Sequence, residues 1–237
     1  MRRPSLALPL LAAALALTPA AATAESPVSG SFELRVGTYR PDIDSRAGNL
    51  QAGSRGPYEG AFGTGRPLSF KLHVARALPW RAAGSLEVGV GAGFWQVNGQ
   101  ALDLQGLPTA EKTGLRIIPT EVTATWRLDV LWERFSVPLV PYARASLQRY
   151  NWWVTGPGGK TTKTGATNGY AVSGGVGLVL DLLDPTLARE LDADAGVNQT
   201  LLTFDVEKSR VDDFGATETF DLSDSRLTYS VGLVFVF

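Results

Sequence analysis

Titratable side chains recur at alternate positions within otherwise apolar segments of this 237-residue sequence. They carry both signs of charge, so in an enclosed space the chemistry open to them is ion pairing and hydrogen bonding. We expect one connected charge network, with Gln148 filling gaps in it. The residues predicted for this network are Glu33, Arg35, Lys71, His73, Glu87, Glu121, Arg127, Asp129, Arg144, Asp205 and Glu207.

Catalysis is a weaker interpretation of the same residues. His73 is the single histidine, which excludes a metal site with two histidine ligands. Its neighbours on the same strand face, Lys71 and Ala75, do not form a nucleophile-base pair with it. We therefore expect a packed, hydrogen-bonded histidine, and no catalytic residue, metal or cofactor.

Two glycine-rich motifs resemble nucleotide-binding loops but lack the required context. The segment GPGGKTTKTG (156–165) needs a glycine where Val154 stands to form a phosphate loop. The segment GVGAG (89–93) lacks the helix that follows a dinucleotide fingerprint. Its three glycines are better explained as space for long side chains that cross a narrow barrel.

The charged positions belong to eight segments in which apolar and polar residues alternate with a period of two. This period is typical of a β-strand with one apolar face. The segments are 30–40, 68–76, 85–94, 120–130, 142–150, 169–181, 200–207 and 225–237. The pattern predicts an all-β fold, an eight-stranded antiparallel up-and-down transmembrane β-barrel.

Alternation alone does not show which face is inside, because a soluble lipocalin-like barrel alternates as well. Here the apolar face is almost free of charge, and the opposite face carries both signs in similar number. Enclosing the charged face lets these charges pair, while the apolar face meets lipid. We therefore favour a membrane barrel over a soluble periplasmic carrier.

The connections between the segments alternate in length. Residues 41–66, 98–114, 153–168 and 209–224 form long connections, and residues 78–83 and 132–138 form short ones. Outer-membrane barrels have short periplasmic turns and longer outer loops. The intermediate connection, 183–198, is predicted to contain a short helix with Asp184 as its N-cap and Pro185 in its first turn.

Aromatic residues gather near the ends of the segments. Trp80 and Trp132 lie at short connections. The group toward the long connections comprises Trp95, Tyr150, Trp152, Trp153 and Tyr170. Because amphipathic rings favour the two membrane interfaces, we expect these residues to lie there.

The N-terminus has the features of a secretory signal peptide. Two arginines precede an apolar core (6–17), and Ala24 completes a small-residue cleavage pattern. The core is shorter than the about 20 residues of a spanning helix. We predict a signal peptide over 1–24 and one barrel domain over 25–237. The net charge of −1 gives no indication of nucleic-acid binding.

The chain ends on SVGLVFVF, a strand-like run with an aromatic last residue. Ser230, Gly232, Phe235 and Phe237 match the C-terminal assembly signal of Gram-negative outer-membrane proteins. With its predicted strands, the chain resembles the small eight-stranded outer-membrane β-barrels of the OmpA/OmpX type. The resemblance implies a place in the cell outer membrane, contact with outer-membrane lipids and transient binding by the barrel assembly machinery.

We accordingly expect a non-enzymatic protein with a polar, plugged lumen and a structural or adhesive role presented by its outer loops. One alternative is an outer-membrane enzyme that modifies lipids, which requires polar residues gathered around His73 or at the barrel rim. The other is the soluble periplasmic carrier, which requires an apolar internal cavity.

Overall fold

The computed structural model describes residues 28–46, 55–80, 84–103, 105–216, 218–224 and 226–237. The predicted signal peptide lies outside these residues. In the part of the chain that the structure describes, no helix is long and apolar enough to cross a membrane.

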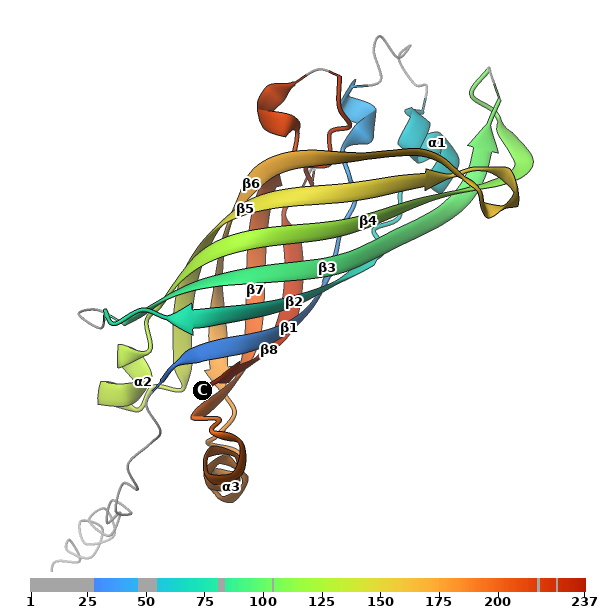
Figure 1. The fold of residues 1–237 in the computed structure, drawn as a ribbon. Coiled ribbons are helices and arrows are strands. Elements are labelled where there is room, and N and C mark those ends of the chain that lie inside the picture. The colour runs from blue at the N-terminus through green and yellow to red at the C-terminus, as the bar shows by residue number, and fades with distance from the viewer. Residues whose placement is uncertain (1–27, 47–54, 81–83, 104, 217, 225) are drawn as a thin grey trace, which may run out of the picture.

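Eight strands form one closed barrel in which each strand pairs antiparallel with the next, and β8 pairs with β1 (Figure 1). The strands are β1 (Gly30–Thr38), β2 (Leu68–Ala77), β3 (Ser85–Leu102), β4 (Pro108–Arg127), β5 (Leu139–Thr155), β6 (Thr161–Val179), β7 (Gln199–Arg210) and β8 (Thr228–Val236). The predicted fold class is confirmed.

The barrel is apolar outside and polar inside. Every strand places large apolar side chains outward, where they stay exposed: Leu34, Leu72, Val90, Val122, Leu147, Val172, Phe204 and Val231 supply one example from each strand. Alternate residues such as Glu33, Glu121 and Asp205 are buried in the interior. Such a surface is unfavourable in water, and it matches the hydrocarbon core of a membrane.

Strands β3 to β6 are much longer than a membrane requires. They have 17 to 20 residues, whereas a transmembrane strand needs about 9–11. The predicted long loops 98–114 and 153–168 are therefore wrong: most of their residues continue two paired hairpins. Hydropathy missed these extensions because threonine, glycine and lysine replace large apolar residues where the strands leave the lipid.

Short helices lie at both ends of the barrel. The helix α1 (Pro57–Phe62) lies at the end toward which β3 to β6 extend, and α2 (Val130–Phe135) and α3 (Pro185–Ala195) lie at the C-terminal end (Figure 1). The side chain of Asp184 accepts hydrogen bonds from the Thr186 and Leu187 amides, at 3.1 and 3.0 Å. The predicted Asp-capped helix is confirmed. Three 3₁₀ turns are η1 (Ile43–Arg46), η2 (Pro157–Gly159) and η3 (Asp213–Gly215).

The barrel closes along the seam between β1 and β8. Seven residue pairs are in register there, from Ser31↔Val236 to Gly37↔Ser230, against 17 pairs between β5 and β6. Past the end of β8, the Phe237 amide donates to the Gly30 carbonyl at 2.9 Å, and the Gly30 amide donates to the Phe237 carbonyl at 3.1 Å. The last residue is thus paired with β1 rather than frayed, as the sequence predicts.

Candidate functional site: a layered barrel interior

The middle of the lumen is organised around the Glu33 carboxylate on β1. Arg35 on the same strand face donates to both of its oxygens, at 3.1 and 3.2 Å. Arg144 on β5 reaches the same carboxylate across the lumen at 2.6 Å and also donates to Thr125 at 3.0 Å. Glu33, Arg35 and Arg144 are all buried. One carboxylate therefore holds two guanidinium groups from opposite walls.

Lys71 joins this group to the carboxylates nearer the end of the barrel toward which β3 to β6 extend, which we call the outer end. Its Nζ atom lies 3.2 Å from Glu207 and 3.5 Å from Glu121. Glu207 also lies 3.8 Å from Arg35, and Gln148 donates to Glu121 at 3.1 Å. A cavity bordered by Arg35, Lys71 and Glu207 measures about 10 Å³, roughly the space that one water molecule needs.

A second group lies nearer the C-terminal end of the barrel. Arg127 contacts Glu87 at 2.5 Å, and Ser31 donates to the other oxygen of Glu87 at 2.7 Å. Within the described residues, no hydrogen bond or ion pair links this group to Glu33. The structure thus divides the predicted network in two. It also places Asp129 outside the lumen, because β4 ends at Arg127 and Asp129 precedes α2.

Asp205 is the least compensated carboxylate of the lumen. It is 2% exposed, and its nearest cation is Arg35, with 3.7 Å between the charged atoms. The Tyr142 hydroxyl is the hydrogen-bonding neighbour of Asp205, but the two groups do not meet full hydrogen-bond geometry within the described residues. The interior carries four cations, Arg35, Lys71, Arg127 and Arg144. It carries five carboxylates, Glu33, Glu87, Glu121, Asp205 and Glu207, so the carboxylates outnumber the cations by one.

His73 lies between a hydroxyl and a carboxylate, as in a catalytic relay, but it is not accessible to a substrate. Its Nε2 atom lies 2.6 Å from the Thr123 hydroxyl, and its Nδ1 atom lies 3.9 Å from Glu33. The distance to Glu33 exceeds that of a hydrogen bond. His73 and Thr123 are each 2% exposed. A substrate has no room beside them, since even a β-carbon on Gly89 would come within 2.7 Å of the imidazole ring.

Glycines in β3 make space for the charged layer, as the sequence predicts. A β-carbon on Gly91 would lie 3.0 Å from the Glu121 side chain, and one on Gly93 would lie 2.9 Å from Pro119. Gly232 on β8 is similarly confined, with 2.8 Å to the Thr203 hydroxyl. The proposed assembly-signal glycine therefore also has a packing role in the lumen. Outside the barrel, the Phe235 ring of the same signal stacks on Phe32 at 6.5 Å between centroids.

An apolar layer closes the lumen toward the outer end. Trp95 donates to the Tyr39 carbonyl at 3.2 Å, and the Tyr39 hydroxyl donates to the Leu222 carbonyl at 2.5 Å. The buried residues of this outer apolar layer are Tyr39, Tyr58, Trp95, Leu115, Ile117, Tyr150, Trp152, Val211 and Leu222. Tyr39, Tyr58, Val211 and Leu222 of this layer belong to the described parts of the β1–β2 and β7–β8 connections.

The predicted interfacial position of Trp95, Tyr150 and Trp152 is therefore wrong. Trp95 continues the inward face of β3 that begins with Glu87, and Tyr150 and Trp152 continue that of Arg144 on β5. The alternation of the strands already indicated that these three side chains face inward. The prediction placed them at the membrane interface because they lie close to the long connections in the sequence. Tyr170 and Trp80 do face outward, with 43% and 44% of their surface exposed.

A second apolar layer lies at the C-terminal end of the barrel. Val140, Val179, Leu201, Val234 and Val236 form this inner apolar layer, and Val28 and Trp132 pack against it. The charged groups therefore lie between two apolar layers. Low dielectric on both sides strengthens the ion pairs and raises the cost of any unpaired charge.

Ion pairs fix the connections over the outer end. Arg66 binds the fully buried Asp224 through two contacts of 2.5 and 2.9 Å, and Thr228 donates to the same carboxylate at 2.7 Å. Arg46 holds Asp212 and Asp221 at 3.7 and 3.8 Å. The sequence analysis missed Asp224, because a single aspartate in a polar connection has no periodic signal.

Burial perturbs two titratable groups of this outer end. Partial burial raises the pKa of Asp42, and the nearby carboxylates of Asp221 and Asp44 add to the effect. Burial also raises the pKa of the Tyr58 hydroxyl to about 12. Tyr58 consequently remains a hydrogen-bond donor at neutral pH.

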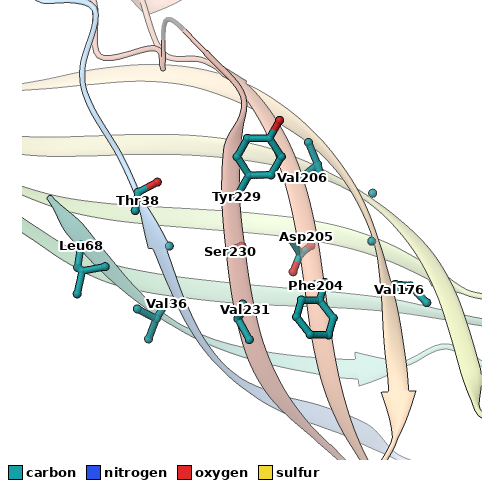
Figure 2. A pocket seen from close by; sticks show the side chains of 13 residues that line it. Val36, Thr38, Leu68, Val176, Phe204, Asp205, Val206, Tyr229, Ser230 and Val231 are labelled. Atoms are coloured by element: carbon teal, nitrogen blue, oxygen red, sulfur yellow. The ribbon is translucent and has the colours of Figure 1, made fainter. Parts of the chain in front are cut away.

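The lipid-facing wall has a groove of about 560 Å³ near the closing seam (Figure 2). Apolar side chains of Val36, Leu68, Val176 and Phe204 line it, and Gly174 supplies no side chain. The lumen residue Asp205 also borders the groove.

No family model and no curated protein matches this chain. Solved structures similar to it include Neisserial surface protein A, with 12% identity, a TM-score of 0.46, and coverage of 90% of this chain and 98% of that one. The attachment invasion locus protein Ail of Yersinia pestis is 11% identical, with a TM-score of 0.39 and coverage of 89% of this chain and 100% of that one. The outer membrane protein AlkL is 15% identical, with a TM-score of 0.37 and coverage of 93% of this chain and 95% of that one.

Chemically, the interior can store and balance charge, but it offers no accessible nucleophile. Within the described ranges, no three acidic or histidine side chains are grouped so that they could hold a metal ion. The apolar exterior, charged interior and extended hairpins are those of an outer-membrane β-barrel.

Proposed function

We propose that this outer-membrane barrel is a non-enzymatic protein with a closed lumen, and that it serves a structural or adhesive role through its outer end. The proposal rests on the succession of buried apolar and charged layers through the lumen. Within the described residues, the outer apolar layer is followed by the two charged groups. The inner apolar layer comes after them.

The outer end is built to project beyond the membrane. The β3–β4 and β5–β6 hairpins continue for several residue pairs past the last apolar lipid-facing side chains. They are joined edge to edge, since β4 pairs with β5 from Gly114 to Arg127. A continuous sheet of this kind offers a firm surface for another molecule, whereas a mobile loop would lose entropy on binding.

The wall of the barrel supports contact with outer-membrane lipids. Above the apolar band, Arg116 lies over the Phe94 ring and Arg149 binds Asn168, and both cations are exposed. Guanidinium groups at this height suit lipid phosphates. Transient binding by the barrel assembly machinery is supported by the match of Ser230, Gly232, Phe235 and Phe237 to the assembly signal, with Phe237 held in the closing seam.

The two alternative functions find less support. A lipid-modifying enzyme needs its reactive groups at the lipid boundary or the rim, and His73 is buried in mid-lumen. A soluble carrier needs an apolar cavity inside and a polar surface outside, and the barrel has the reverse arrangement.

Trimming one hairpin tests the proposed role. Residues 99–113 are replaced by Asn-Gly, which suits a two-residue hairpin turn between Asn98 and Gly114. The control variant replaces α3 (185–195) at the opposite end with a short Gly-Ser linker. Barrel folding is checked by heat-modifiable migration on gels.

An adhesive role predicts that cells with the trimmed hairpin lose attachment to an epithelial monolayer, while the control retains it. A structural role predicts that cells lacking the whole protein become sensitive to detergent, and that both variants restore resistance. Equal attachment and equal detergent resistance in all strains would contradict the proposal.

A further inference from the structure

An apolar cavity of about 270 Å³ lies at the outer end, between α1 and the concave face of the extended hairpins. Ala61 and Phe62 of α1 form one wall, Ala101 and Leu115 the other, and Val154 and Phe220 also line it. The Trp152 and Phe220 rings meet at 4.6 Å between centroids, so the wall at Phe220 is fixed by the outer apolar layer.

The cavity exists because α1 rests directly on β3. A β-carbon on Gly99 would lie 2.0 Å from the Ala61 carbonyl oxygen, and one on Gly60 would lie 3.0 Å from Leu102. Glycine at both contact points lets the helix approach the strand. The Asp44 carboxylate accepts from the Tyr58 and Glu59 amides at 2.7 and 3.1 Å and fixes the start of the helix.

One polar group in the cavity wall has no partner. Tyr58 lines the cavity, it is 2% exposed, and its hydroxyl makes no hydrogen bond within the described residues. A buried, unsatisfied hydroxyl is unfavourable, so such groups usually have a ligand or a water molecule as partner.

One cation stands at the rim of the cavity. Lys163 pairs in register with Val154, which places both residues on the same face of the sheet. Its Nζ atom lies 5.2 Å from the centroid of the Phe220 ring. Within the described residues Lys163 makes no ion pair, whereas Arg40, over the Tyr58 ring, is paired with Asp44 and Glu59.

We propose that this cavity binds a single-chain amphiphile with a carboxylate head, such as a medium-chain fatty acid. The alkyl chain occupies the space between α1 and β3–β5, Lys163 attracts the carboxylate at the rim, and Tyr58 offers a hydrogen-bond donor. The volume lies just below the range of about 300–1,000 Å³ of drug-sized sites, which favours one short chain over a two-chain lipid. This inference is independent of the proposed adhesive role.

Photo-crosslinking in lipid nanodiscs tests the site with the mature, full-length chain. The probe is decanoate with a terminal diazirine, the head-group control is the matching decanol, and the lipid control is a diazirine phosphatidylcholine in the disc. We expect decanoate to label peptides that contain α1 and the β3–β4 hairpin. We expect the phosphatidylcholine to label the apolar band instead.

Substitutions then separate the cavity from its rim. Ala101→Phe and Ala61→Leu each fill the space and should abolish labelling there, while Leu107→Phe at the exposed hairpin tip should leave it unchanged. Lys163→Gln should weaken decanoate binding about threefold and leave decanol unaffected, with Lys160→Gln as the matched control. Gel migration verifies that each variant folds.

Labelling that is spread over the lipid-facing strands, or that both cavity-filling variants leave intact, would overturn the proposal. Equal loss of decanoate and decanol binding in Lys163→Gln would overturn the assignment of the carboxylate head. Attachment of cells by the wild type is measured separately, so either proposal can fail alone.

Discussion

The carboxylates of the lumen differ in how fully the structure compensates them. Glu33 accepts charge-assisted hydrogen bonds from two arginines, at 2.6 to 3.2 Å, whereas Asp205 has one cation at 3.7 Å and the Tyr142 hydroxyl beside it. Burying a charge costs free energy unless partners replace its hydration. Identical chemistry should therefore have opposite effects at these two positions.

Asp205→Asn is predicted to raise the free energy of unfolding by about 1 kcal/mol, because it removes an excess buried charge. Arg35 keeps Glu33 and Glu207 as partners in this variant. Glu33→Gln should instead lower the free energy of unfolding by about 3–5 kcal/mol, because it leaves two guanidinium groups undercompensated. The measurement is the melting temperature of refolded protein, read from the loss of the compact band on gels. A large decrease for Asp205→Asn would contradict this assignment.

Asp42 should make the stability of the outer end depend on pH. Folding raises the pKa of Asp42, so the protonated form stabilises the folded state. This contribution to the free energy of unfolding is full below the ordinary pKa of about 4. It is lost as the pH rises through the pKa of the folded state. At neutral pH, Asp42→Asn should slow amide hydrogen exchange in the 211–224 connection, and the difference should vanish below about pH 4.

The control for this pH dependence is Asp194→Asn in α3, at the opposite end of the barrel. It should leave exchange in the outer connection unchanged at both pH values. A benefit of Asp42→Asn that persists unchanged in acid would show that the carboxylate charge is not its source.

Among the elements, the strands and their faces were predictable from the sequence, and the ends of the elements were not. Period-two alternation placed the buried charges Glu33, Arg127 and Glu207 correctly on the inward faces. It could not predict that Arg144 reaches Glu33, because pairs across the lumen depend on the tilt and stagger of the closed barrel. Asp129 was misplaced because β4 ends at Arg127, three residues before the end of the predicted segment, and Asp129 is the N-cap of α2.

The connections were the least predictable elements. Their inward-folding residues, Tyr58, Val211 and Leu222, are single apolar positions in polar segments without a period. Alternation has no information about loops that fold back over a barrel mouth. For this reason the apolar cavity beside α1 could be found only from the structure.

The docking of α1 should depend on the absence of a side chain at Gly99. In Gly99→Ala, the new β-carbon meets the Ala61 carbonyl oxygen, so we expect α1 to move away from β3. Hydrogen exchange should increase in α1 while the melting temperature of the barrel changes little. Gly106→Ala at the hairpin turn is not a suitable control because its φ of 78° favours glycine, and Gln100→Ala serves instead. Unchanged protection of α1 in Gly99→Ala would contradict the contact.

For the whole molecule, the stacking of layers predicts that the barrel does not conduct. An eight-stranded barrel has room only for its own side chains. Here apolar layers also lie on both sides of the charged groups, and we expect them to exclude water. Wild-type protein in planar bilayers should show no steady channel, and Trp95→Ala alone should not open one, because the inner apolar layer remains. A stable, large conductance of the wild type would show that the lumen is open.

The short seam between β1 and β8 has a consequence for how the barrel forms over time. Its seven residue pairs join the first strand to the last one, which are the two strands farthest apart in the sequence. Closing so long a loop has the largest entropy cost, and fewer residue pairs offset it than between any other two neighbouring strands. The 17 pairs between β5 and β6 join neighbouring segments and cost far less to initiate. We expect a curved sheet centred on β3–β6 to assemble early and the seam to join last. Until then the free edges of β1 and β8 are available to a catalyst of insertion, and the same seam is where a mature barrel would first reopen.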